Sequence, residues 1–310
     1  MAESESFVLE AEQHWETYGV GGTCIWGGHN LAVADVDGDG VKEMVTGGFS
    51  YYLLPNGSRT IWSAPLKIWN WDGKNLTLEK NYSWTGNIGC VYAGDADGDG
   101  KTELITVGNM TNSTGSYPSL RIWTWDGETL VLRGSYEGKT IGSVFVSDVD
   151  RDGKPEIITV SGGYVSVTQS VAQLSIFRWN GTSITLITSV DCCGTNGGRA
   201  NSVYAYDLNN DGMTEIVTAG YANSLNNSKG QLRVWQFNGT GLSLKSDAEW
   251  YMIDGVYSVD VAGNIMGNTL VGTVKVADFD SDGVPEIVTG GFTYNGTQVE
   301  GHLRIWNWSG

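Results

Sequence analysis

The sequence predicts an all-β fold, a closed five-bladed β-propeller whose blades are four-stranded antiparallel sheets. An acidic loop motif recurs five times, each copy lies between two alternating apolar segments, and the segment missing after the last copy occurs at the start of the chain. The composition agrees, because 44 glycines, 13 tryptophans and only 17 % charged residues suit short strands and tight turns better than helices. We expect one domain over residues 1–310.

The acidic motif has aspartates at alternate positions, glycine at its sixth position and glutamate at its ninth, as in DVDGDGVKE at 35–43. The other copies occupy 95–103, 148–156, 207–215 and 278–286. Their first residues are 60, 53, 59 and 71 positions apart. Regular recurrence at this spacing indicates a repeat architecture.

Each motif joins two strands, and two more strands complete the repeat. Apolar residues alternate before the motif, as at 143–148, and an apolar run such as EIVTGG at 286–291 follows it. A third segment carries aromatic residues, as in LRIWTWDG at 120–127, and most copies end in Asp-Gly or Asn-Gly. Those pairs signal a tight hairpin that leads into a fourth strand. The repeat is therefore a four-stranded antiparallel sheet of about 60 residues.

The two ends of the chain predict how the sheets close into a ring. The last repeat stops at its hairpin, at 303–310, without a fourth strand. Residues 7–15 align without gaps with the fourth strands at 76–84 and 242–250. We therefore expect the amino-terminal strand to complete the carboxy-terminal blade, which removes free sheet edges. The alternative, a linear solenoid, would leave 303–310 without a partner.

The five motifs in register, each followed by an apolar strand, resemble the FG-GAP or VCBS repeat family, which provides the calcium-bearing blades of integrin α-subunit propellers. The resemblance covers almost the whole chain and implies that partners dock on the face opposite the calcium loops. Two features depart from it. The ninth loop position is Glu where integrin-type loops usually carry Asp, and there are five repeats where seven are common.

Alternate carboxylates on a tight loop can converge on one hard cation, and Ca²⁺ takes six to eight oxygen ligands. We expect up to five structural Ca²⁺ ions. Each would be held by side chains at the first, third, fifth and ninth loop positions and by the carbonyl of the seventh. The expected ligands are Asp35, Asp37, Asp39, Val41 and Glu43; Asp95, Asp97, Asp99, Lys101 and Glu103; Asp148, Asp150, Asp152, Lys154 and Glu156; Asp207, Asn209, Asp211, Met213 and Glu215; and Asp278, Asp280, Asp282, Val284 and Glu286.

The loop sequence allows two other interpretations. An EF-hand shares the DxDxDG start, but it needs helical flanks and a bidentate Glu at the twelfth position. Every copy has a threonine there, at Thr46, Thr106, Thr159, Thr218 and Thr289. In a metal-free interpretation the aspartates only cap turns.

The charge balance favours the metal. The loops hold 19 of the 35 acidic residues, so 16 acids elsewhere face 18 Lys and Arg. The net charge of −17 therefore comes from the loops, and five Ca²⁺ would reduce it to −7. This acidity argues against a nucleic-acid partner, and no run of 18 apolar residues exists to span a membrane.

An exported protein is expected from the ten Asn-x-Ser/Thr sites, which exceed the roughly four that random placement gives. Asn-Gly turns followed by threonine would create the same sites for structural reasons. The start of the chain lacks signal-peptide features. We expect an extracellular or cell-surface glycoprotein, a monomeric ring that could belong to a longer chain.

Loops of varying length, at 49–64, 191–200 and 251–271, fall on the face opposite the calcium loops, and variable loops of repeat proteins often bind partners. Most tryptophans repeat in the third and fourth strands and indicate packing between blades. The exceptions suggest a ligand platform or ordinary loop anchors, and two further residues suit the channel mouth. The platform candidates are Trp26, Tyr51, Tyr52 and Trp62, and the channel candidates are His29 and Arg199.

The four cysteines also fall on this variable face. Cys24 and Cys90 precede the first strands of adjacent blades, so a disulfide between them is expected if the protein is exported. Cys192 and Cys193 are neighbours and form either a vicinal disulfide or two thiols. Neither spacing matches a zinc or thioredoxin motif.

These features predict a non-catalytic binding or adhesion module that recognises a glycan or a surface protein. One alternative is a glycosidase or lyase acting on polysaccharide, although no nucleophile elbow, His-Asp-Ser order or phosphate loop occurs. A second alternative is a purely structural ring within a larger surface protein. We assign no catalytic residue and no cofactor other than calcium.

Overall fold

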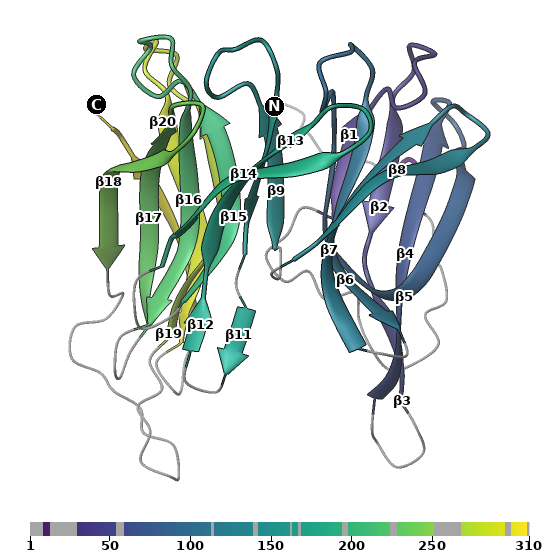
Figure 1. The fold of residues 1–310 in the computed structure, drawn as a ribbon, viewed down its shortest axis with the longest axis horizontal. Coiled ribbons are helices and arrows are strands. Elements are labelled where there is room, and N and C mark those ends of the chain that lie inside the picture. Colours follow the sequence, from purple (N-terminus) through teal and green to yellow (C-terminus); the bar gives the residue numbers. More distant parts are fainter. Residues whose placement is uncertain are drawn as a thin grey trace, which may run out of the picture.

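The computed structural model is an all-β protein of mainly antiparallel sheets (Figure 1). The structure describes residues 9–12, 30–53, 59–112, 115–138, 142–161, 163–166, 169–193, 198–223, 228–250, 268–294, 299–308 and 310. Within these ranges no helix is long and apolar enough to cross a bilayer.

The strands follow the five repeats in order. The first two repeats contain β1 (Leu31–Ala34), β2 (Glu43–Gly47), β3 (Ser50–Leu53), β4 (Arg59–Trp71), β5 (Leu76–Gly94), β6 (Glu103–Asn112), β7 (Gly115–Trp125) and β8 (Leu130–Glu137). The third contains β9 (Ser143–Ser147), β10 (Glu156–Val160), β11 (Gly163–Ser166), β12 (Gln169–Val171), β13 (Gln173–Trp179) and β14 (Ile184–Asp191). The last two contain β15 (Gly198–Tyr206), β16 (Glu215–Asn223), β17 (Ser228–Phe237), β18 (Leu242–Trp250), β19 (Asn268–Ala277), β20 (Glu286–Tyr294) and β21 (Val299–Trp306).

The strand order predicted within a repeat is confirmed. The acidic loop joins an antiparallel pair in every repeat, namely β1–β2, β5–β6, β9–β10, β15–β16 and β19–β20. The second strand then pairs with the aromatic third strand in every repeat, and in the first four repeats a tight turn leads to a paired fourth strand. Alternating apolar residues and Asp-Gly or Asn-Gly turns were therefore sufficient to define the local meander.

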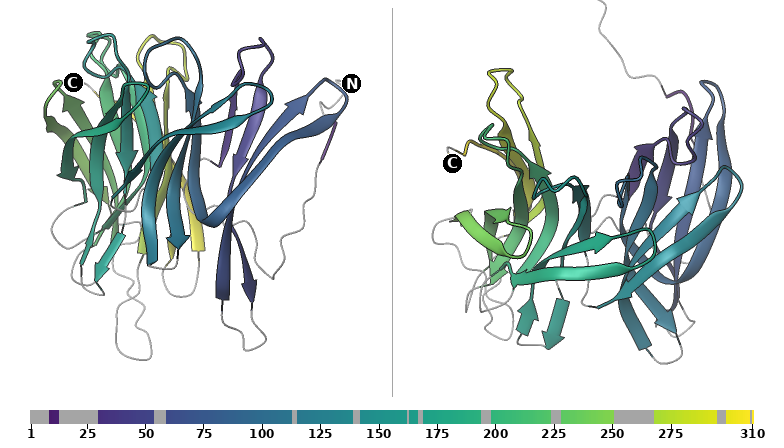
Figure 2. Two further views of the ribbon diagram at one scale, coloured as in Figure 1. Left: turned by 45° about the vertical axis from the view of Figure 1, so that its right-hand side comes forward. Right: turned by 45° about the horizontal axis from the view of Figure 1, so that its top comes forward.

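The predicted closed five-bladed propeller is wrong. The described strands form four sheets of 8, 4, 2 and 7 strands, and none of them is closed. Residues 9–12, the described part of the expected amino-terminal strand, are not in a strand, and β21 pairs only with β20 among the described strands. Figure 2 shows β1–β2 and β20–β21 as separate ends of the series. Apolar alternation specifies a strand and its faces, but it does not specify a partner almost 300 residues away.

The sheets are also joined where the sequence predicted breaks. β5 is a single strand of 19 residues that serves as the fourth strand of the first repeat and the first strand of the second. β17 and β19 meet in a parallel pairing at Ser228 and Asn268. Neighbouring repeats therefore share hydrogen-bonded sheets in two places.

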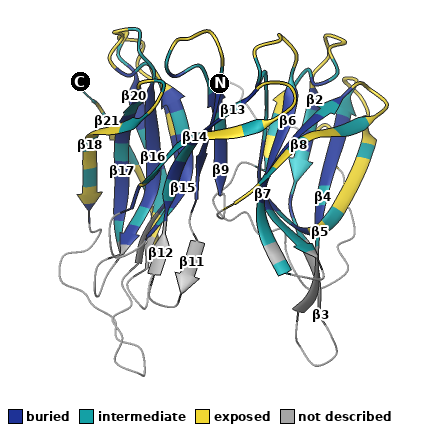
Figure 3. Ribbon diagram, viewed as in Figure 1, coloured by how far each residue is buried: buried dark blue, intermediate teal, exposed yellow. Residues whose placement is uncertain are grey.

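The hydrophobic core lies between neighbouring repeats. Ile68 of the first repeat packs in one cluster with Leu104 and Trp123 of the second, and Ile122 of the second packs with Ile157 of the third. Equivalent clusters follow along the chain. Figure 3 shows buried residues along the inner strands, and exposed ones at the loop ends and along parts of β5, β14 and β18. Burial of apolar area between sheets therefore holds the repeats together.

A tryptophan on the third strand is anchored to the second strand in four repeats. In each, the indole Nε1–H donates to the threonine at the twelfth motif position, at 2.9 to 3.0 Å. The pairs are Trp69 with Thr46, Trp123 with Thr106, Trp235 with Thr218 and Trp306 with Thr289. Four of the five threonines that argue against an EF-hand thus have a packing role.

We expect Thr218→Val to lower the free energy of unfolding by about 1–3 kcal/mol, because it leaves the buried Trp235 indole without its acceptor. Chemical denaturation with calcium present measures this. Thr159→Val is the matched control, since in its repeat Phe177 occupies the third-strand position of the tryptophan and has no N–H to leave unpaired. Equal losses in the two variants would contradict the role of the indole hydrogen bond.

Candidate metal centres

The five acidic loops share one hydrogen-bond frame. The first Asp accepts from the N–H of the sixth-position glycine at 2.7 to 3.0 Å, as Asp35 does from Gly40. The fifth-position Asp accepts from the seventh N–H at 2.6 to 2.9 Å. Because the same bonds recur in every copy, the motif encodes a fixed loop shape. The structure shows the seventh N–H; the expected role of the seventh carbonyl stays a prediction.

Two loop positions adopt the left-handed backbone conformation. The sixth is always glycine, for example Gly40 at φ 91°, which meets no Cβ penalty there. The fourth position is also left-handed, and in three loops it is not glycine: Arg151 has φ 61°, Asn210 57° and Ser281 63°. This conformation is uncommon outside glycine, so the surrounding loop holds these residues in place.

The ninth-position glutamate lies beneath each loop. All five are at most 8 % exposed, and each Oε2 accepts from the backbone N–H of the second loop residue at 2.9 to 3.0 Å. Burial raises the pKa of Glu43, Glu103 and Glu215, and that of Glu103 reaches about 7. A nearby cation would favour the ionised form of these buried acids.

The carboxylates converge closely enough to share one ion. In four loops, three ligand oxygens lie within 4.8 Å of one another. The groups are Asp35, Asp37 and Asp39; Asp95, Asp97 and Asp99; Asp148, Asp150 and Glu156; and Asp278, Asp280 and Asp282. In the fourth loop, Asn209 replaces one Asp, and Asp207 Oδ1 is buried without a hydrogen-bond partner among the described residues. Converging oxygens and an orphaned acceptor fit a hard cation such as Ca²⁺.

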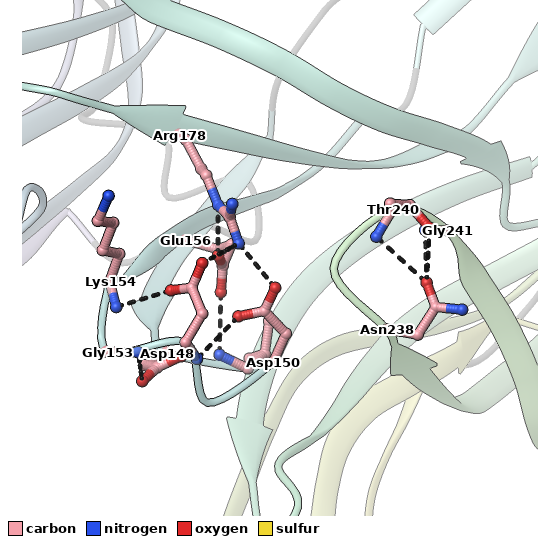
Figure 4. A network of polar contacts seen from close by, with 11 residues as sticks. Asp148, Asp150, Gly153, Lys154, Glu156, Arg178, Asn238, Thr240 and Gly241 are labelled. Carbon is pink, nitrogen blue, oxygen red and sulfur yellow. Dashed lines mark hydrogen bonds and ion pairs between the residues drawn. The ribbon is translucent and has the colours of Figure 1, made fainter.

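The third loop differs because a guanidinium already lies among its acids (Figure 4). Arg178 Nη2 is 2.7 Å from Asp150, 2.9 Å from Asp152 and 2.7 Å from Glu156, and Arg178 Nε donates to Glu156 at 2.8 Å. Burial alone would lower the pKa of Arg178, but these carboxylates raise it overall. A divalent cation would have to displace this internal cation from three expected ligands, so this loop does not fit calcium as it stands.

The hairpin turn of the following repeat covers each of the first four loops. A Cβ on Gly127 would lie 3.1 Å from Asp37, one on Gly181 3.1 Å from Asp97, and one on Gly239 3.0 Å from Asp150. A Cβ on Gly310 would lie 3.7 Å from Asn209 Nδ2. Glycine at these turns therefore allows the hairpin to approach the loop closely, and it also allows the positive φ of the turn. Each of these four loops therefore lies at a boundary between two repeats.

Adjacent loops also touch one another. Asn210 Nδ2 in the fourth loop donates to the carbonyl of Gly283 in the fifth at 2.7 Å. Arg151 in the third loop lies against Gly212 in the fourth. The left-handed fourth position thus reaches the glycine of the next loop, which explains part of its constraint. The loops gather at one end of the sheets, the upper end in Figure 1.

The predicted ligand residues of the opposite face are only partly described. Trp26, His29 and Cys24 lie outside the described residues, so their roles and the Cys24–Cys90 disulfide stay predictions. Tyr51 and Trp62 are directly opposite each other in the β3–β4 pair, with Tyr52 next along β3. Arg199 is half-buried on β15, and its Nε has no hydrogen-bond partner among the described residues.

The vicinal cysteines are two thiols. Cys192 and Cys193 are both buried, and their sulfurs are 3.9 Å apart, well beyond the length of a disulfide bond. The hydrogen bond with the Cys193 thiol, and then burial, raise the pKa of Cys192. These cysteines pack as small apolar side chains.

Sequence reasoning missed two charged residues near the loops. Arg178 occupies a third-strand position that holds Asn70, Thr124, Gln236 and Asn307 in the other repeats, so aligning the repeats would have exposed it as the single cation. Glu79 on β5 lies near the first loop, and burial and the charges of Asp37 and Asp39 raise its pKa. It adds a carboxylate to that loop, and no motif indicated it.

Comparison with known proteins gives no family for this chain. No protein-family model and no curated protein matches it. Among solved structures, it is similar to the rhamnogalacturonan lyase PL11 of Bacillus licheniformis, with a TM-score of 0.44 and 16 % identity. The match covers 88 % of this chain and 58 % of that one, so this chain spans little more than half of that protein.

Proposed function

We propose that this protein is a calcium-stabilised extracellular module of the FG-GAP or VCBS type that recognises a glycan or a surface protein. The proposal is supported by the common hydrogen-bond frame of the five loops, each with a buried glutamate beneath it, and by the convergence of carboxylates in four of them. Calcium binds at four of them, the first, second, fourth and fifth, and Arg178 replaces it in the third.

Calcium would stabilise both the loops and the boundaries between repeats. Each free loop crowds three or four acids, which repel one another, and a divalent cation turns that repulsion into attraction. Because the next hairpin packs on the third loop position, an ordered loop also fixes its neighbour. Calcium concentrations are high outside cells, where weak extracellular modules are filled, in agreement with the predicted export.

We expect calcium titration of the chelator-stripped protein by isothermal titration calorimetry to give four ions per chain. Asp278→Asn should reduce this to three, because the first-position Asp anchors the loop and contributes a ligand. Atomic absorption after gel filtration provides an independent count.

Asp37→Asn is the matched control for the titration, since the fourth loop already carries Asn209 at this position. It should weaken one site without removing it. Wild-type protein that binds no calcium in the millimolar range would overturn the proposed function. Five calcium ions per wild-type chain would overturn only the proposal that Arg178 excludes calcium from the third loop.

A further inference from the structure

The boundary between the second and third repeats lacks the large side chains that fill equivalent boundaries. Between the first and second repeats, Arg121 lies 4.7 Å over the ring of Trp84 and 5.8 Å from that of Trp123. Between the fourth and fifth, Arg304 lies 5.0 Å over Trp250 and 5.8 Å from Trp306. A cation stacked between two indoles therefore seals these boundaries.

At the second boundary all three members of this arrangement are smaller. The register of the third and fourth strands places Gly138 where Trp84 and Trp250 stand, Ser175 where Arg121 and Arg304 stand, and Phe177 where Trp123 and Trp306 stand. The third boundary keeps its cation and indole, Arg233 and Trp235, 5.9 Å apart. Among the four boundaries between described repeats, this one alone has lost the arginine and both tryptophans.

The lost volume is present as a cavity of about 310 Å³ between β8 and the β10, β13 and β14 strands. Its lining is Tyr136, Gly138, Thr159, Ser161, Gln173, Ser175, Phe177, Leu186 and Ser189. Gly138 and Leu186 are exposed, so the cavity can be reached from solvent. Its volume lies at the lower end of the range for small-molecule sites.

The lining chemistry is neutral and of two kinds. Tyr136 and Phe177 form an aromatic corner, with ring centroids 4.8 Å apart. The lining also holds hydroxyls and an amide that both donate and accept: Ser175 and Ser189 share a hydrogen bond of 2.9 Å, and Gln173 Nε2 donates to Asp191 at 3.3 Å. Thr159, whose counterparts accept an indole N–H, lines the cavity with its neighbour Ser161.

We propose that this cavity binds one neutral sugar unit, with the apolar face of the ring on Tyr136 and Phe177 and its hydroxyls on Thr159, Ser175, Ser189 and Gln173. A charged ligand is disfavoured because no acid or base lines the cavity, and burying an unpaired charge is costly. A purely apolar ligand would leave the hydroxyls unsatisfied. This proposal specifies the recognition role proposed above, and it rests on the ligand in that role being a glycan rather than a surface protein.

The cavity lies on the expected recognition side of the molecule. The second strand β10 begins at the acidic loop and runs away from it, so Ser161, just past its far end, lies towards the opposite face. Ser189 is close to the end of β14, just before the variable loop 191–200. A sugar bound here could continue into a longer chain across that face.

The test is saturation-transfer-difference NMR of the calcium-loaded protein with millimolar methyl glycosides of neutral hexoses, pentoses and deoxyhexoses. We expect transfer to at least one glycoside. The double variant Ser175→Arg with Phe177→Trp rebuilds the packing of the other repeats and should abolish that transfer while keeping the melting temperature. Ser135→Arg, an exposed change on the neighbouring strand β8, should bind as the wild type does.

If the double variant fails to fold, Thr159→Val with Ser189→Ala removes two hydroxyls at nearly constant volume and should weaken binding by about tenfold or more. Unchanged transfer in a folded cavity-filled variant would overturn the proposal, as would no transfer from any glycoside to the wild type. Binding of a charged ligand, acetyl-arginine methylamide, in place of sugars would also overturn it, because the neutral lining is expected to disfavour charge. None of these outcomes alters the calcium count, which separately decides the calcium-binding part of the proposed function.

Discussion

Stripping calcium with excess EDTA is expected to lower the melting temperature by about 20 °C or more. A ligand at about 100 times its Kd stabilises a folded protein by about 2.7 kcal/mol per site, so four independent sites would contribute about 11 kcal/mol. That is comparable with the whole stability of an ordinary domain, about 5–15 kcal/mol. In chains of about 150–250 residues each kcal/mol corresponds to about 2–4 °C, so the lower end applies to this longer chain. Differential scanning calorimetry in EDTA and in calcium measures the shift.

Magnesium is the control for this experiment, because a smaller ion that demands octahedral geometry should restore little of the lost stability. Matched ionic strength removes general screening from the comparison. The individual contributions can be separated with Asp278→Asn, whose melt in calcium should fall by about a quarter of the full shift if the sites act independently. A melting temperature that is the same in EDTA and calcium would contradict structural calcium at these loops.

The local structure of this protein could be predicted from sequence because its signals are local. The loop at 95–103 was predicted between two strands and lies between β5 and β6. Its frame depends on neighbours at most eight positions apart, such as Ala96 and Glu103. Period-two alternation and tight-turn pairs also act over a few residues. Such features follow from side-chain chemistry and backbone geometry alone.

The arrangement of the sheets depends on contacts that the sequence pattern does not specify. Residues 7–15 have the alternation of a fourth strand, but their described part is not in one. The continuity of β5 through two repeats depends on how sheets meet, as does the contact of Gly239 with Asp150. Aligning the repeats column by column would have found Arg178, Ser175 and Phe177 as exceptions. Only the structure shows that Arg178 occupies the third loop and that Ser175 and Phe177 leave a cavity open.

Arg178→Asn is expected to add a calcium site and to make the protein more dependent on calcium. Asparagine is the residue at this position in the first and fifth repeats, Asn70 and Asn307, so the change imitates loops expected to bind metal. Without the guanidinium, Asp150, Asp152 and Glu156 are free to bind the ion, together with Asp148, whose Oδ1 is buried and has no partner among the described residues. Calorimetric titration should rise from four ions to five.

In EDTA the same variant should be less stable than the wild type by about 3 kcal/mol, because removing one partner of a buried ion pair leaves uncompensated charge. Glu156 is fully buried, while Arg178 is 29 % exposed, which favours the lower end of the usual range. Saturating calcium should recover most of this loss. Chemical denaturation of the wild type and of Arg178→Asn, each in EDTA and in saturating calcium, gives the four free energies of unfolding that this comparison needs.

Asn70→Arg is the reciprocal change. It places a guanidinium at the equivalent position beside the first loop, where Asp37, Asp39 and Glu43 correspond to the acids that Arg178 contacts. The count should fall from four ions to three, and the stability lost on chelation should become smaller. If both substitutions leave the stoichiometry unchanged, the third-strand side chain does not control metal access, and the third loop binds or rejects calcium for another reason. Opposite changes in the two variants would show that one residue decides whether a loop carries its own cation or takes one from solution.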